Sequence, residues 1–497
     1  MNEWEHFTKH AILGTGRQPF SLPNHQGPLS KLWAQLETPA SEEKLLHGAA
    51  LLTEYRRAGW QPPTHEMQSI PSQPEMLPQC TAKAASSLRM IWQEDNRDIQ
   101  TRLLREWLYL ARTAGQRVPF EMLPPLLDNA KKHKKLWPLL LDTIGQRGHW
   151  LAKLNPDWQY FAAEVLGDKD TFTIGSHSAR LAYLQQCRAT NPPQARELLA
   201  TSWQQEAAQE RQEFLAILWN QLSLADAEFL ENCLKDRSQT VRQITAQMLG
   251  SLADSRLLKQ MLERLSHYIR VKKGRLKPTL EINLPTKYDQ KWAQEGIKEK
   301  SPSYPKMGEK AWWLCQMLLR VRPSFLLAQL ELSAESYLRM LYKTDFADML
   351  YDTLITATKI HRDNLLAITL VKKSKAKDFL NTLSQLAEAL PNVERERLLQ
   401  EYLKSHKSPT WFQMNQIVGL FPGRMSLNLS QRLIAILPQL LKHNKHDSYR
   451  NSTLTSLAVV LAPNCYESIS QLAAEHFGTE DFVRIYRFRS QMIKEFN

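Results

Sequence analysis

Apolar residues recur at steps of three and four along most of this 497-residue chain, and this spacing limits the possible folds more than any other feature. Between residues 99 and 111 the recurring apolar residues are Ile99, Leu103, Leu104, Trp107, Leu108 and Ala111. Such a period places the apolar side chains on one face of an α-helix, with the intervening arginines on the other face. Gly115 and Pro119 follow and are typical of a helix end.

Similar amphipathic segments cover much of the remaining chain. They lie near residues 44–58, 83–93, 122–130, 207–221, 226–235, 239–252 and 311–320, and they recur from residue 336 to the end. The alternation of apolar and polar residues that marks a strand is nearly absent. The sequence therefore predicts an all-α fold.

One pair of helices indicates how such segments pack. The first offers Phe229, Leu230, Cys233 and Leu234 to one side, and the second offers Val241, Ile244, Thr245, Met248, Leu249 and Leu252. Asp236 or Ser238 is expected to cap the second helix. Two helices cannot bury these stripes alone, so we predict an α-solenoid of stacked antiparallel helix pairs with an elongated, curved body.

Arg237 and Arg242 flank the start of the second helix of this pair and allow two interpretations. They could hold a phosphate at the helix end, or they could support the turn between the two helices. We favour support of the turn, because the apolar stripe already explains why the helix exists.

Residues 270–310 interrupt the helical pattern. This interval holds eleven Lys or Arg and five Asp or Glu, a surplus of six out of the chain's net charge of +13. Leu280, Ile282 and Leu284 alternate with polar residues between Pro278 and Pro285, which predicts one short strand or an extended loop. A second irregular stretch, residues 61–78, contains five prolines and cannot be helical throughout.

These interruptions suggest four regions. We expect an N-terminal helical region with a proline-rich excursion at residues 1–80 and a helical-repeat domain at 81–269. A basic irregular linker or insertion would follow at 270–310, and a C-terminal helical-repeat domain at 311–497.

Composition restricts the environment and the partners. The sequence pI near 9.4 favours polyanions or acidic protein surfaces as partners. Five widely spaced cysteines without a CxxC motif argue against a disulfide framework and against a cysteine zinc site. No apolar run approaches the roughly 18 residues of a membrane span, and the N-terminus lacks the pattern of a signal peptide. We therefore expect a cytoplasmic protein that is not membrane-bound.

The helix pair resembles a HEAT repeat at Asp236, Val241, Arg242, Ile244, Met248 and Leu249. Further landmarks are Ala11 to Thr15 with Arg17 and Pro19, and residues 145–158, 236–242 and 282–285. With these landmarks the chain resembles an uncharacterised bacterial family of HEAT-like helical-repeat proteins. Members of that family tend to be encoded beside MoxR-type AAA ATPases, von Willebrand factor A-domain proteins and SWIM zinc-finger proteins. The resemblance implies a partner within a multi-protein assembly.

The densest polar and aromatic cluster is residues 145–158, here called the tryptophan turn. It contains Arg147, His149, Trp150, Asn155 and Trp158. The turn could form a pocket for a flat or anionic group, or it could be a sharp connection pinned by its tryptophans. The structural interpretation is favoured, but these five residues are the first candidates for partner binding.

Basic residues supply the other candidates. Lys272, Lys273, Arg275 and Lys277 lie in the irregular basic stretch. Lys131 to Lys135 end an apolar helix, where cations complement the helix dipole, although the same run could meet phosphate.

Other patterns give weaker evidence for a functional site. Gly14 to Arg17 lacks the spacing of a phosphate-binding loop and is expected to end a helix. His443 and His446 have helical spacing but lack further ligands for a metal. We predict no catalytic, cofactor-binding or metal-binding residue, no cofactor and no enzymatic activity.

Three functional hypotheses follow. The first is a non-enzymatic scaffold or adaptor that docks a protein partner, with an AAA ATPase or von Willebrand factor A-domain protein suspected from the resemblance. The alternative is nucleic-acid binding through a basic face of the helical array. A third, a HEAT-like base-excision enzyme, would need Trp150, Trp158 and Asp157 in a basic cleft.

Overall fold

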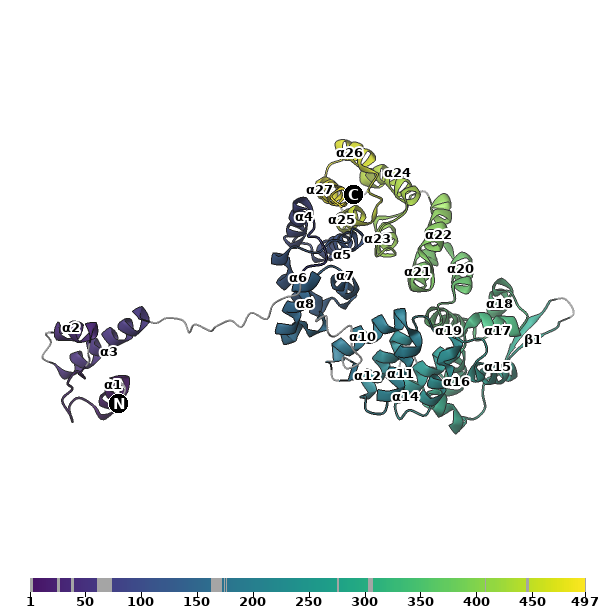
Figure 1. Cartoon of the computed structure of the whole chain (residues 1–497). Helices are drawn as coiled ribbons and strands as arrows, with labels where there is room; N and C mark the ends of the chain where they lie inside the picture. The colour runs from purple at the N-terminus through teal and green to yellow at the C-terminus, as the bar shows by residue number, and fades with distance from the viewer. Residues whose placement is uncertain are drawn as a thin grey trace. The chain divides into compact units, whose positions relative to one another are not determined.

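The computed structural model describes residues 3–24, 27–36, 40–59, 74–161, 172–173, 175, 177–274, 277–302, 307–406, 408–443 and 447–496. The chain divides into two compact units, Met1–Pro71 and Ser72–Asn497, here called the N-terminal unit and the repeat unit. Helices dominate both units, and the only sheet among the described residues has two strands (Figure 1). The predicted all-α, solenoid-like class is confirmed. No described helix combines the length and apolar character needed to cross a lipid bilayer.

The N-terminal unit contains α1 (Glu3–Leu13), α2 (Pro28–Ala34) and α3 (Ser41–Ala58). Its small core consists of Phe7, Phe20, Leu29, Trp33 and Leu52. The ring of Phe7 lies 5.1 Å from that of Phe20 and 5.9 Å from that of Trp33. A small aromatic-rich core, with partly buried apolar side chains packed against it, thus joins the three helices.

The repeat unit begins with α4 (Ala82–Trp92), α5 (Arg97–Thr113), α6 (Leu123–Lys132), α7 (Trp137–Leu141) and α8 (Gly145–Leu154). The Asn96 side chain caps α5 by accepting from the backbone N–H groups of Asp98 and Ile99. The apolar stripe predicted for α5 is buried at every predicted position. Gly115 follows with a φ of 63°, a left-handed conformation that glycine adopts without steric cost.

Further along the described part of the chain lie α10 (His177–Thr190), α11 (Pro192–Ser202), α12 (Ala208–Leu218), α13 (Ala227–Cys233), α14 (Gln239–Leu249) and α15 (Arg256–Tyr268). Contacts join α13 to α14, and they also join α10 to α12 and α12 to α14. Helices therefore stack on the helix two places along the chain, as in a solenoid. The predicted helix pair corresponds to α13 and α14.

The turn between α13 and α14 is held from both sides. Ser238 caps α14 by accepting from the backbone N–H of Val241. The carboxylate of Asp236 accepts from the N–H of Ser238 and pairs with the buried Arg211. The Arg242 guanidinium donates to the carbonyl oxygens of Asp236 at 2.5 Å, Arg237 at 3.1 Å and Ala293 at 2.8 Å. Arg242 therefore supports the turn.

A hairpin follows α15. Its strands β1 (Ile269–Lys272) and β2 (Thr279–Ile282) are antiparallel, with Ile269 opposite Ile282 and Lys272 opposite Thr279. The sequence indicated β2 but gave no sign of β1. The β1 partner is hard to recognise because a basic run continues through it.

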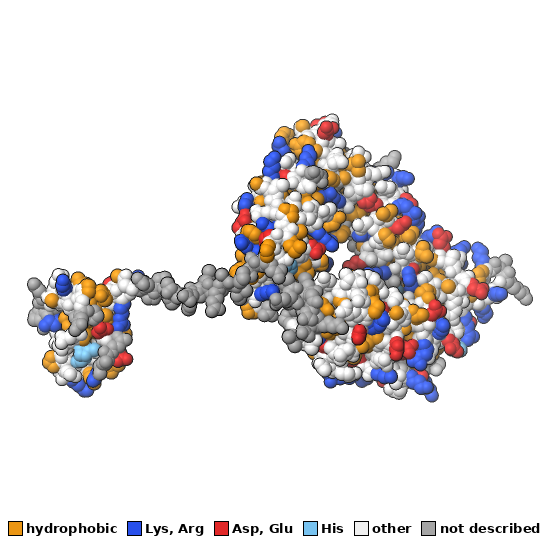
Figure 2. Space-filling model, viewed as in Figure 1, with side chains coloured by type: hydrophobic (Ala, Val, Ile, Leu, Met, Phe, Trp, Pro, Cys, Tyr) orange, Lys and Arg blue, Asp and Glu red, His pale blue; other side chains and the backbone are white. Residues whose placement is uncertain are grey.

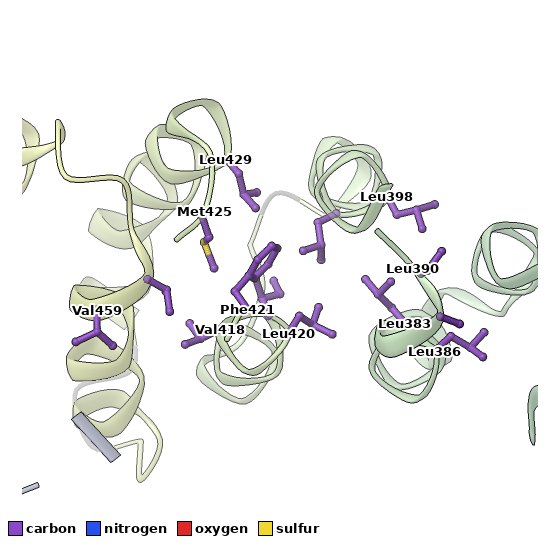
Figure 3. Close-up of a cluster of buried hydrophobic side chains, with 14 of the residues drawn as sticks. Leu383, Leu386, Leu390, Leu398, Val418, Leu420, Phe421, Met425, Leu429 and Val459 are labelled. Atoms are coloured by element: carbon purple, nitrogen blue, oxygen red, sulfur yellow. The ribbon is translucent and has the colours of Figure 1, made fainter. Parts of the chain in front are cut away.

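Helices continue the stack to the C-terminus. They are α16 (Glu309–Leu318), α17 (Pro323–Gln329), α18 (Ala334–Leu341), α19 (Ala347–Ile360), α20 (Asn364–Lys373), α21 (Phe379–Gln385), α22 (Asn392–Ser405), α23 (Trp411–Gly419), α24 (Leu427–His443), α25 (Arg450–Val460), α26 (Tyr466–Glu475) and α27 (Glu480–Lys494). Short 3-10 turns join some elements: η1 (Phe120–Met122), η2 (Lys134–Leu136), η3 (Pro156–Phe161), η5 (Leu224–Asp226), η6 (Gln290–Glu295), η7 (Ala376–Asp378) and η8 (Ala387–Ala389). Buried leucines from several of these helices, among them Leu383, Leu398 and Leu429, belong to one apolar cluster (Figure 3).

The two ends of the repeat unit pack against each other. Helix α27 contacts α4 and α5, and α25 contacts α5 (Figure 1). The Trp107 ring lies 5.3 Å from that of Phe496, and the Ser87 hydroxyl donates to Glu495 at 2.5 Å. An open, elongated array would keep its ends apart, so the repeat unit differs from that expectation. Buried contacts between its first and last helices close the array.

Candidate functional site

The tryptophan turn begins with a capped helix. The Glu75 carboxylate accepts from the backbone N–H groups of Gln146 and Arg147, both at 2.9 Å, at the start of α8. Gly145 has a φ of 66°, and a Cβ there would lie 2.5 Å from Glu75 Oε2. Glycine at position 145 therefore lets an acidic side chain approach the positive end of the helix.

The side chains of the turn are engaged in local contacts. The guanidinium carbons of Arg147 and Arg117 lie 3.9 and 4.0 Å from the centre of the Phe120 ring. The His149 Nδ1 lies 2.6 Å from the Phe161 carbonyl oxygen, and burial lowers the pKa of His149. His149 is therefore neutral near pH 7, which suits its half-buried position.

Asn155, Asp157 and Trp158 close the turn. Asn155 accepts from the backbone N–H of Asp157, and the Trp158 indole N–H donates to Asp128 at 2.8 Å. Asp157 is exposed and pairs with Lys131 at 2.6 Å, while Trp150 is half-buried. The polar groups of Asp157 and Trp158 thus bond to residues of α6 and fix the turn to that helix.

The basic hairpin presents a different surface. Lys272, Lys273 and Lys277 are exposed at its tip, while Leu280 on β2 is buried. Arg275 lies outside the described residues. His446 also lies outside them, and no group of three or more metal-binding side chains occurs within the described part of the chain. Among its described residues, the hairpin thus presents three exposed lysines near its tip.

A recess with converging cations lies elsewhere, between α5, α7 and the turn before α24. Figure 2 shows Lys and Arg spread over the visible face, so charge alone does not mark a site. Two adjoining recesses of about 640 and 590 Å³ share Arg102, Arg105, Lys135 and Pro422. We call them together the basic groove. Its cationic lining residues are Arg102, Arg105, Lys131, Lys132, Lys135 and Arg424.

Helix α5 supplies one wall of the basic groove. Its buried stripe faces the core and leaves Arg105 and Tyr109 exposed one helical turn apart. Arg102 is anchored by Asp98 at 3.0 Å and by the Phe421 carbonyl oxygen at 3.3 Å. Lys131 and Lys132 end α6, and Lys135 lies in η2, so the tight connection to α7 brings all three lysines to the groove.

The opposite wall is the turn at Pro422, Gly423 and Arg424. Its position is fixed by the buried side chains of Leu420, Phe421 and Met425 on either side (Figure 3). The backbone N–H of Met425 donates to the Val460 carbonyl oxygen at 2.7 Å, which ties the turn to α25. A buried anchor on both sides keeps the three exposed turn residues at the groove.

Among the described residues that line the groove, Glu106 is the one carboxylate. It accepts from Arg489 at 2.5 and 2.8 Å and from Arg424 at 2.5 Å. Burial raises the pKa of Glu106, but the charges and hydrogen bonds of Arg489 and Arg424 outweigh it, so the pKa lies below its ordinary value. Glu106 is ionised at neutral pH, and two arginines offset its charge.

The model of a family described as "Family of unknown function (DUF5691)" matches residues 6–496. The chain belongs to this family. No curated protein and no solved structure matches it. The groove, the tryptophan turn and the basic hairpin all lie within the span that the family model covers.

Some of the residues that line the groove can be recognised from the sequence alone. The sequence predicts a possible phosphate contact at Lys131 to Lys135, and the arginines of α5 form a polar helix face. Arg424, however, is 319 residues from Arg105. No local spacing relates two residues so far apart, and closure of the array is what brings them to one recess.

Proposed function

We propose that the protein binds nucleic acid in the basic groove. The observation that carries this proposal is the presence of six cationic side chains around the two adjoining recesses of the groove. The one carboxylate among the described lining residues, Glu106, is already paired with two arginines. A positive recess with low-dielectric walls concentrates its field and attracts polyanions. The chain's net charge of +13 adds to this attraction.

The cations of the groove differ in availability. The side chains of Arg105, Lys132 and Lys135 are exposed and make no hydrogen bond or ion pair with another described residue. Lys131 pairs with Asp157, but both side chains are exposed, and such pairs contribute little. Phosphate contacts at these positions would therefore displace few existing interactions.

The rest of the lining favours nucleic acid over an acidic peptide. Apolar surface from Pro138, Leu139 and Pro422 lies among the cations. Nucleic acid offers regularly spaced phosphates together with flat, apolar base faces, whereas an acidic peptide segment offers mainly carboxylates.

Fluorescence anisotropy with a labelled oligonucleotide at low salt tests the proposal. The full chain should bind, and Lys132→Ala with Lys135→Ala should weaken binding. The matched control is Lys375→Ala with Lys377→Ala, which removes the same charge from exposed positions at the start of η7, outside the groove. Absence of binding by the full chain, or equal loss in both double variants, would refute the proposal. Equal competition by polyglutamate would point to an acidic protein partner instead.

A second candidate function is the scaffold or adaptor role, which one surface favours. Phe412, Tyr449 and Phe477 are 48%, 40% and 94% exposed. The rings of Phe412 and Tyr449 are 5.3 Å apart, and the neighbouring Arg450 donates to the Phe477 carbonyl oxygen. Aromatic side chains dominate the energetic centres of protein interfaces.

The AAA ATPase or von Willebrand factor A-domain partner and the bacterial origin belong to this second proposal. A cytoplasmic location belongs to both, supported by five cysteines that are all buried free thiols. Affinity capture from the native cell should recover such a partner with the wild type and lose it when Phe412, Tyr449 and Phe477 become alanine. Recovery that is unchanged by these substitutions would exclude this surface.

A further inference from the structure

Tyr109 occupies an unusual place in the basic groove. It is 56% exposed on α5, although eight other residues of that helix are buried in the core. Its ring is therefore not required to hold α5 in place. Arg105 precedes it by one helical turn, and both residues line the larger recess with Lys135 and Arg424.

We propose that the groove selects single-stranded nucleic acid, with Tyr109 as the platform on which an unpaired base stacks. This inference rests on the proposed function and specifies the form of nucleic acid. Base stacking on an exposed aromatic ring tolerates any sequence, because every base has a flat π-face. A paired base inside a duplex already has both faces covered by its neighbours.

The residues that line the recess with Tyr109 suit both the bases and the phosphates of a single strand. Pro138, Leu139 and Val459 line the same recess as Tyr109 and provide an apolar lining that suits a base turned inward. Arg105, Lys135 and Arg424 line the same recess and suit the phosphates on either side of that base.

The walls of the recess also limit what can enter. Helix α5, helix α7 and the turn at Pro422 to Arg424 surround a volume of about 640 Å³. A flexible strand can place one or two nucleotides inside, whereas a rigid duplex would reach only the outer cations.

Binding of an oligothymidylate of about 15 nucleotides and of a duplex of the same length distinguishes these forms. The wild type should bind the single strand at least tenfold more tightly than the duplex. Tyr109→Ala should weaken single-strand binding by roughly tenfold and leave duplex binding nearly unchanged. Tyr109→Phe, which keeps the ring, should bind like the wild type.

Tyr466→Ala is the matched control, since it removes another exposed tyrosine that does not line the groove. Unchanged thermal unfolding would show that Tyr109→Ala remains folded. Equal binding of both forms, or an equal effect of Tyr109→Ala on both, would overturn the single-strand inference and leave nucleic-acid binding intact. Failure of both forms to bind would overturn the proposed function as well.

Discussion

Glu106 on α5 and Arg489 on α27 form a two-point ion pair between residues 383 positions apart in the chain. The two hydrogen bonds measure 2.5 and 2.8 Å. Arg489 is fully buried and also donates to the carbonyl oxygens of Ala458 and Leu461. This pair joins the first helices of the repeat unit to the last, and its Glu106 lines the basic groove.

Loss of the Glu106 charge should destabilise the repeat unit. Glu106→Gln leaves the buried Arg489 without a counter-charge, so the free energy of unfolding should fall by about 3–5 kcal/mol. Urea denaturation of the full chain measures this change. Glu121→Gln is the control, because Glu121 pairs with Arg89 where both side chains are half exposed and should cost less than about 1 kcal/mol. Equal effects would mean that the buried pair contributes no more than a surface pair.

The same pair predicts a dependence of stability on pH. The pKa of folded Glu106 lies below its ordinary value of 4.5, so its ionisation stabilises the folded state above that pH. This contribution should disappear as the pH falls through the folded pKa. The difference in melting temperature between wild type and Glu106→Gln should therefore be largest near neutral pH and shrink in acid. A difference that stays constant with pH would contradict this assignment.

Binding in the basic groove should depend on salt in proportion to the phosphates it contacts. For a single strand, the slope of log K against log salt concentration is about −0.7 per phosphate. Lys132→Ala with Lys135→Ala should make the slope less steep by roughly 1.4, the sum of two contacts. Titrations at several salt concentrations measure it. An unchanged slope would place both lysines away from the phosphates.

Gly145 and Gly115 provide a matched test of the cap on α8. Both have positive φ, but a Cβ would meet Glu75 only at position 145. Gly115→Ala should cost about 1–2 kcal/mol from backbone strain alone. Gly145→Ala should cost a further 0.5–2 kcal/mol, roughly the value of a helix cap, because Glu75 must release two N–H groups.

Chemical denaturation of both glycine variants in wild-type and Glu75→Ala backgrounds separates the cost of backbone strain from the cost of losing the Glu75 cap. The excess at position 145 should vanish when Glu75 is removed. An excess that persists would assign it to a neighbour other than Glu75.

Arg242 and Arg237 should respond differently to alanine. Arg242 donates to three carbonyl oxygens and its loss should cost about 2–3 kcal/mol. The exposed Arg237 side chain makes no hydrogen bond or ion pair with a described residue, so Arg237→Ala should stay within about 0.5 kcal/mol. Thermal unfolding ranks the two variants, and similar losses would indicate a further role for Arg237.

Local patterns in the sequence were enough for the helices and their buried faces. The stripes from Ile99 to Ala111 and from Val241 to Leu249 follow from a period of 3.6 residues, which depends only on the chain's own geometry. The strand β2 was visible because its residues alternate, whereas its partner β1 was not, because pairing depends on a second segment. The turn around Arg242 was anticipated, but its bond to the Ala293 carbonyl oxygen was not.

The sequence by itself determined the helical class, the buried faces of helices such as α5 and α14, and the excess of positive charge. Only the tertiary structure decided where that charge converges. Arg105 and Arg424 meet in one groove because the last helices return to the first, and Glu106 and Arg489 hold that contact. The physical reason is that helix periodicity is local, whereas closure sums small rotations between many stacked helices, and no short stretch of sequence records that sum.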